Sequence, residues 1–152
     1  MTTIPAAKVT RASHALPFWL SLGLVPVAII SALVGGWAVL LMPLASWGLF
    51  SLLDSIIGKN TDNPDLETPE AGLGWYRAIT LIWFPVQFAL LIWLLYYVPR
   101  AEHLGVLEAI LIFFGMGVIS GSIGINYSHE LMHQKSKLER WLADLLLATV
   151  LY

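Results

Sequence analysis

Hydrophobic residues run through this chain in long stretches that charged residues rarely interrupt. Between residues 16 and 57 the only formally charged side chain is that of Asp54. At about 1.5 Å per residue, a helix over this stretch would be roughly twice as long as the hydrocarbon core of a bilayer, which is about 30 Å thick. The adjacent Gly35 and Gly36 near its middle favour a turn. We therefore predict a hairpin of two membrane-spanning helices, over about residues 17–34 and 37–57.

Charged residues and prolines interrupt the apolar pattern at residues 58–77, which we interpret as a polar loop outside the membrane. A short helix is expected to begin in this loop at Thr68, a good N-cap residue that Pro69 follows. Two further apolar runs predict a third and a fourth membrane-spanning helix, over about 78–98 and 105–126. Hydrophobic residues then recur at helical spacing over 138–152 and predict the start of another helix.

The third and fourth predicted spans contain a few residues that suggest how the helices pack. Gly117 and Gly121 have the spacing of a GxxxG motif, and Ser120 and Gly124 extend the same small-residue stretch, which predicts the close approach of another helix. Gln87 in the third span and Glu108 at the start of the fourth are polar. We expect them to satisfy hydrogen bonds between helices or to face the outer surface of the membrane.

The amino-acid composition agrees with a membrane protein. Charged residues make up 12% of the 152 residues and hydrophobic residues 58%, whereas soluble proteins contain about 25% charged residues. The fold class that this predicts is an all-α transmembrane helical bundle. The net charge of -2 gives no indication of nucleic-acid binding. The chain has no cysteine, which excludes disulfides, cysteine-ligated metal sites and a cysteine nucleophile within it.

The distribution of basic residues predicts the orientation in the membrane, because cytoplasmic loops are enriched in Lys and Arg. With a cytoplasmic N-terminus, only Arg100 of the eight basic residues falls outside. The others fall on the cytoplasmic side: Lys8, Arg11, Lys59, Arg77, Lys135, Lys137 and Arg140. The same topology places His129 and His133 on the cytoplasmic side and His103 on the opposite side.

The candidate chemistry lies in the stretch from Asn126 to Lys135, which contains His129, Glu130 and His133. Residues four apart share one face of a helix, so both imidazoles would point the same way. Such a pair is a good start for a transition-metal site. If the fourth helix continues past Asn126, the histidines lie about 5 Å and about 10 Å beyond its membrane end. A metal there would sit at the mouth of the bundle.

Three interpretations of this pair are open from the residues alone. His129-Glu130-x-x-His133 is literally the HExxH motif of zinc metalloproteases, in which the glutamate acts as general base. Polar residues follow the motif here, and a third ligand would have to come from His14, His103 or a loop carboxylate. The second interpretation is an iron site that activates dioxygen, and the third is a helical membrane protein in which the pair binds no metal.

The flanking residues resemble a known family. The run from Asn126 to Leu142, with H-E-L-x-H followed by L-E-R-W-L, closely resembles the first histidine box of the integral-membrane alkane 1-monooxygenases. This family is related to the membrane fatty-acid desaturases and to xylene monooxygenase. Asp54-x-x-x-Gly58 and the later Asn63-Pro64 also look like the family's D-x-x-x-G…N-P segment. The resemblance covers most of the chain, from the second predicted helix onward.

The resemblance implies a bacterial inner-membrane enzyme that inserts one oxygen atom of O₂ into the terminal C–H bond of an alkane. The family uses two non-haem irons in a histidine-rich cytoplasmic site and a bundle of about six transmembrane helices. Its electrons come from rubredoxin, which a flavin-containing, NADH-dependent rubredoxin reductase reduces. By this resemblance His129 and His133 would be iron ligands, and Glu130 would be a neighbour that orients an imidazole.

Two features depart from the family pattern. Gln134 stands where many members have lysine, and the two further histidine boxes of the family do not occur in this chain. We therefore expect residues 1–152 to be the N-terminal part of a single desaturase-like domain, with four spans and the start of a fifth helix. Without further histidines, this chain alone is expected to be inactive.

Overall fold

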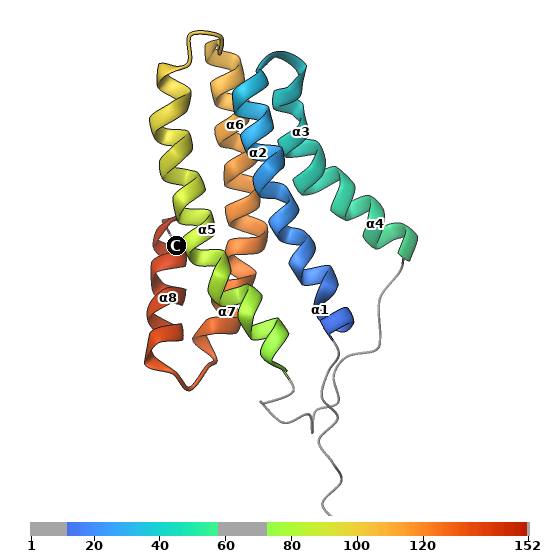
Figure 1. The fold of residues 1–152 in the computed structure, drawn as a ribbon, viewed down its shortest axis with the longest axis vertical. Helices are drawn as coiled ribbons and strands as arrows, with labels where there is room; N and C mark the ends of the chain where they lie inside the picture. Colours follow the sequence, from blue (N-terminus) through green and yellow to red (C-terminus); the bar gives the residue numbers. More distant parts are fainter. Residues whose placement is uncertain (1–11, 58–72, 152) are drawn as a thin grey trace, which may run out of the picture.

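The computed structural model describes residues 12–57 and 73–151. These residues form helices without any strand in the described part, which confirms the all-α class (Figure 1). The α-helices are α1 (Ala12–Trp19), α2 (Leu24–Val34), α3 (Leu41–Pro43), α4 (Phe50–Ile57), α5 (Gly74–Tyr97), α6 (Val106–Ile119), α7 (Ile125–Met132) and α8 (Lys137–Ala148). The 3₁₀ segments Leu20–Gly23, Gly36–Leu40 and Val98–Arg100 and the π-helical segments Leu44–Leu49 and Ser120–Gly124 join them.

The first half of the described chain is the hairpin that the sequence predicts. The 3₁₀ segment Leu20–Gly23 joins α1 to α2, and the reversal falls at Gly35 and Gly36, whose φ angles are +66° and +55°. These positive φ values strain any residue with a side chain, which explains why glycines occupy the turn. Ser31 donates its hydroxyl to the carbonyl oxygen of Ala38 at 2.9 Å and closes the turn from inside.

Within residues 12–57 and 73–151, two helices are long and apolar enough to cross a membrane. They are Gly74–Arg100 and Val106–Met132, with 27 residues each. Leu20–Val34 and Gly36–Gly48 are apolar but shorter, so the count of four spans stays a prediction. The expected helix at Thr68 lies outside the described residues.

Hydrogen bonds hold together the end of the bundle that carries the turns at residues 35–36 and 101–105 (Figure 1). The carboxylate of Glu108 accepts the backbone N–H of Gly36 and, at 2.5 Å, that of Gly105. His103 Nε2 lies 3.1 Å from the carbonyl oxygen of Ala32. Glu108 thus bonds the turn at residues 35–36 to the turn at 101–105, as expected of a polar residue that satisfies hydrogen bonds between helices.

Gln87 is the polar centre of the bundle, with 1% of its surface exposed. Its Oε1 accepts the indole N–H of Trp83 at 2.8 Å, and its Nε2 donates to Thr149 Oγ1 at 2.9 Å. A buried amide without such partners would be costly in an apolar surrounding. The expected hydrogen bond between helices is confirmed, and it joins α5 to the end of α8.

The close packing predicted for this small-residue stretch occurs at Gly124, but not at Gly117 and Gly121 within the described part of the chain. A Cβ atom added to either would meet nothing there within 4 Å. Close approaches occur at Gly115, which the motif spacing did not indicate, and at Gly124. A Cβ on Gly115 would lie 2.6 Å from Met42 Cβ, and one on Gly124 would lie 2.6 Å from Gln87 Oε1.

Gly115→Ala is expected to destabilise the bundle by about 1–3 kcal/mol, because the added methyl collides with the rigid Cβ of buried Met42 and forces α3 and α6 apart. Gly117→Ala on the same helix is the matched control. It meets open space in the described part and should leave stability unchanged or slightly raised. Thermal unfolding in detergent, followed by circular dichroism, compares the two. Equal melting temperatures would contradict the close packing of α3 on α6.

Candidate metal centre

The two motif histidines lie at the end of the bundle opposite the turns at 35–36 and 101–105 (Figure 1). Helix α6 continues through the π-helical segment Ser120–Gly124 into α7, so the fourth helix extends past Asn126. His129 is in the last turn of α7, and His133 is its C-cap residue with φ −80° and ψ −4°. The pair is therefore one helical turn apart.

Both motif histidines are exposed, whereas other side chains of α7 are buried. Tyr127, Ser128 and Leu131 face the bundle. Ser128 is fully buried and donates its hydroxyl to the carbonyl oxygen of Ala143 in α8 at 3.1 Å. Neither His129 nor His133 has a side-chain hydrogen bond to the described residues. No hydrogen bond to the described residues therefore occupies their ring nitrogens, which could bind a ligand.

The chain reverses directly after His133. Gln134 donates its backbone N–H to the carbonyl oxygen of Leu131 at 3.1 Å, and its side-chain Nε2 donates to the carbonyl oxygen of Glu130 at 3.2 Å. Ser136 then adopts an extended conformation and serves as the N-cap residue of α8. The polar residues that follow the motif form a tight turn between two helices that pack on each other.

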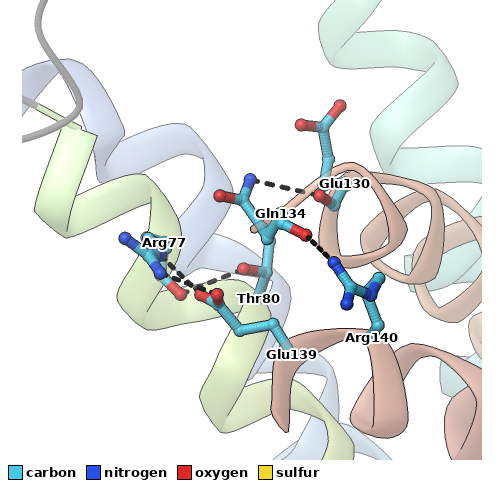
Figure 2. Close-up of polar contacts among 6 residues, drawn as sticks. All are labelled: Arg77, Thr80, Glu130, Gln134, Glu139 and Arg140. Atoms are coloured by element: carbon cyan, nitrogen blue, oxygen red, sulfur yellow. Dashed lines mark hydrogen bonds and ion pairs between the residues drawn. The ribbon is translucent and has the colours of Figure 1, made fainter. Parts of the chain in front are cut away.

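An ion pair joins the first turn of α8 to the first turn of α5 (Figure 2). Arg77 Nε donates to Glu139 Oε1 at 2.5 Å, and a terminal guanidinium nitrogen donates to Glu139 Oε2 at 2.6 Å. The Glu139 side chain is 3% exposed and that of Arg77 is 40% exposed. Glu139 is charged, yet the structure buries it.

Arg140, the next residue, bonds instead to residues 134–136, the turn after His133, which we call the motif turn. One of its terminal nitrogens donates to the carbonyl oxygens of Gln134 and Lys135, each at 3.2 Å (Figure 2 shows the first). The last carbonyls of a helix and of its exit turn lack partners within the helix. Arg140 satisfies two of them. Two adjacent charged residues of the L-E-R-W run in α8 thus bond in different directions. Glu139 bonds to α5, and Arg140 bonds to the turn after His133.

A hollow of about 670 Å³ opens beside the motif, between α1, α5 and α7. Its lining includes the polar His129, Glu130 and Gln134, polar residues of α5 (Arg77 and Thr80), and the apolar Phe18 and Ile123. The side chain of Tyr127 also lines the hollow. The Tyr127 hydroxyl donates to the carbonyl oxygen of Phe18 at 2.9 Å and lies 3.2 Å from Ser21 Oγ.

The structure does not bring a third ligand to the pair within the described residues. No group of three His, Cys, Asp or Glu that could hold a metal occurs among them. His103 is at the opposite end of the bundle, as predicted. The side chains of His14 and Asp54 and the loop 58–72 lie outside the described residues. The roles of His129 and His133 as ligands and of Glu130 as their neighbour stay predictions.

Apolar helices of membrane length and two exposed histidines at the end of one of them define an all-α membrane protein with a candidate metal site. Comparison with curated proteins then gives the family. The chain is 35% identical over 143 residues to alkane 1-monooxygenase 2 of Pseudomonas aeruginosa, a match that covers 90% of this chain and 35% of that protein. Alkane 1-monooxygenase 1 of the same species is 36% identical over 76% of this chain and 31% of its own length.

The alkane 1-monooxygenase of Pseudomonas putida is 31% identical over 77% of this chain and 30% of its own length. The chain belongs to the alkane monooxygenase family. It spans about a third of the length of the curated relatives that it matches. No family model matches the chain, and no solved structure is significantly similar to it. Nothing in these similarities supports the zinc protease alternative.

Proposed function

We propose that this chain is part of a membrane monooxygenase that hydroxylates the terminal carbon of alkanes, with His129 and His133 as iron ligands. One observation carries the proposal. Two exposed imidazoles without protein partners in the described part lie one turn apart at the end of a membrane-length helix, in a chain related to alkane 1-monooxygenases. The proposed enzyme is a longer protein, of which residues 1–152 form the N-terminal part of one desaturase-like domain.

The residues present fit part of an iron site. Neutral imidazole nitrogens are good ligands for iron, and His129 and His133 can supply two of them from one helix end. A site of two non-haem irons needs more ligands, which we assign to other histidines of the complete protein. Iron would supply the activation of dioxygen. The contribution of Glu130, exposed beside the pair, would be to orient an imidazole.

The hollow beside His129 supports a hydrocarbon substrate that arrives from the lipid phase. Its apolar lining, which includes Phe18 and Ile123, can bind an alkyl chain and exclude water. His129 and Glu130 of the motif also line the hollow. An alkane in the hollow would have contacts with the apolar side chains and would lie beside His129, one of the proposed ligands.

The charges at the motif end support a cytoplasmic orientation of that end. Lys135 and Lys137 lie at this end and are exposed, whereas Arg100 lies at the opposite end. Basic residues are enriched on the cytoplasmic side of a membrane. We therefore assign a bacterial inner membrane with the N-terminus and the motif cytoplasmic. There rubredoxin, reduced by its reductase, would be the donor.

The proposal is tested with the complete protein in membranes, supplied with an alkane, ¹⁸O₂, NADH, rubredoxin and rubredoxin reductase. The expected product is the 1-alkanol with one ¹⁸O atom, detected by mass spectrometry. The omission of rubredoxin should stop product formation, because the other components lack a route for electrons to the iron. Iron-loaded protein that forms no labelled alcohol from any alkane tested would contradict the proposed activity.

A further inference from the structure

We infer that Arg140 and the Arg77–Glu139 ion pair are positioning elements, which fix the turn after His133 and thereby the placement of His133 relative to His129. The inference rests on the proposed function, because it concerns the same two histidines. None of the three residues belongs to the H-E-L-x-H motif.

The first observation is where Arg140 bonds. His133 is the C-cap residue of α7, so the chain leaves the helix there, and Gln134 begins the turn with bonds to the carbonyl oxygens of Leu131 and Glu130. Arg140 holds the carbonyl oxygens of Gln134 and Lys135 together from the first turn of α8. A guanidinium carries several donors in a rigid plane, which suits it to bridge two neighbouring acceptors.

The second observation is what holds Arg140 in place. Glu139 precedes it and is buried against α5, where both carboxylate oxygens accept from Arg77. Such a two-bond pair fixes orientation as well as distance. The first turn of α8 is thus bonded on one side to α5 and on the other to the motif turn (Figure 2).

The third observation is that α8 is also bonded to the buried face of α7. Ser128 donates to the carbonyl oxygen of Ala143, so α7 and α8 cannot slide past each other without losing a buried hydrogen bond. His129 follows Ser128 directly. Helix α8 is therefore bonded to the chain on both sides of the pair, at Ser128 directly before His129 and at the turn after His133.

Arg140→Ala in the complete protein tests the inference. Arg140 is exposed, so the variant is expected to fold. Amide hydrogen exchange at residues 133–136 should rise about tenfold, because the turn loses charge-assisted hydrogen bonds. Iron should also leave about tenfold faster after a chelator is added, which is the effect typical of residues that support metal ligands. Arg140→Lys, which keeps a cationic donor, should recover part of both effects.

Lys137→Ala is the matched control. It removes one positive charge from the same turn of α8, where Lys137 is exposed and makes no side-chain bond to described residues. If Arg140→Ala and Lys137→Ala have the same exchange and the same rate of iron loss, the inference is overturned. Faster exchange with unchanged iron loss also overturns it, since Arg140 would then act on the turn alone.

A different measurement tests the proposed function itself, namely the iron content of the His133→Ala variant. If His133→Ala leaves the iron content of the complete protein unchanged, the ligand assignment fails for all variants alike. The exchange measurement is independent of metal and still decides whether Arg140 fixes the turn.

Discussion

His133→Ala and His129→Ala are each expected to abolish alkane hydroxylation by the complete enzyme and to lower its iron content. Supporting residues near a metal ligand already contribute about 10–100-fold to metal affinity or activity, so the loss of a ligand should exceed about 100-fold. The fold should persist, because both side chains are exposed and neither makes a hydrogen bond to described residues. The measurements are iron per protein by elemental analysis, initial rate of alcohol formation, and melting temperature.

His103→Ala is the control for these two variants. It removes the same side chain from the opposite end of the bundle, where the ring lies 3.1 Å from the carbonyl oxygen of Ala32. We expect it to keep its iron and its activity while it loses some thermal stability. An unchanged iron content in His133→Ala would reject the ligand assignment, and iron loss in His103→Ala would show that the effect is not specific to the motif.

The local features of the fold could be predicted from the sequence because they depend on local physics. Long apolar runs give helices, and the adjacent Gly35 and Gly36 give a turn that needs positive φ. The start of α5 was placed at residue 78, but the helix begins at Gly74. Arg77 had been assigned to the loop because it is charged, whereas the helix extends beyond the apolar run and uses Arg77 to bond α8.

The polar Gln87 predicted a hydrogen bond between helices, but the pairs of helix faces that pack together could not be predicted, because a one-dimensional pattern does not say which face meets a neighbour. The GxxxG spacing singled out Gly117 and Gly121, but the tight contact in the same helix is at Gly115 on Met42. The choice among these glycines depends on where α3 crosses α6. Only the packed bundle determines that crossing.

Only part of the candidate site could be predicted, because spacing along the chain gives neighbours on one helix but not partners on another. The spacing of His129 and His133 predicts that they share one end of a helix, and the structure places them there. The partner of Glu139 could not be found from spacing, since Arg77 lies 62 residues away in the chain. A carboxylate among charged neighbours usually faces water. Its burial becomes visible only when α8 is packed on α5.

Arg77→Ala is expected to destabilise the bundle by about 3 kcal/mol, the lower end of the cost of breaking a buried ion pair. The lower end applies because Arg77 is 40% exposed and its charge is partly solvated, whereas Glu139, at 3% exposed, is left as a buried charge. Glu139→Ala should cost less, about 1–2 kcal/mol, because Arg77 can turn toward water. The free energy of unfolding in mixed detergent micelles measures both.

The double variant Arg77→Ala/Glu139→Gln separates the ion pair from other effects of each substitution. The neutral amide removes the stranded charge at nearly constant volume, so the double variant should be more stable than Arg77→Ala alone. Asp144→Ala, which removes an exposed carboxylate from the same helix, should change stability by less than about 0.5 kcal/mol. If the effects of Arg77→Ala and Glu139→Gln simply add, the two residues are not coupled. The first turn of α8 would then be held to α5 by apolar packing alone.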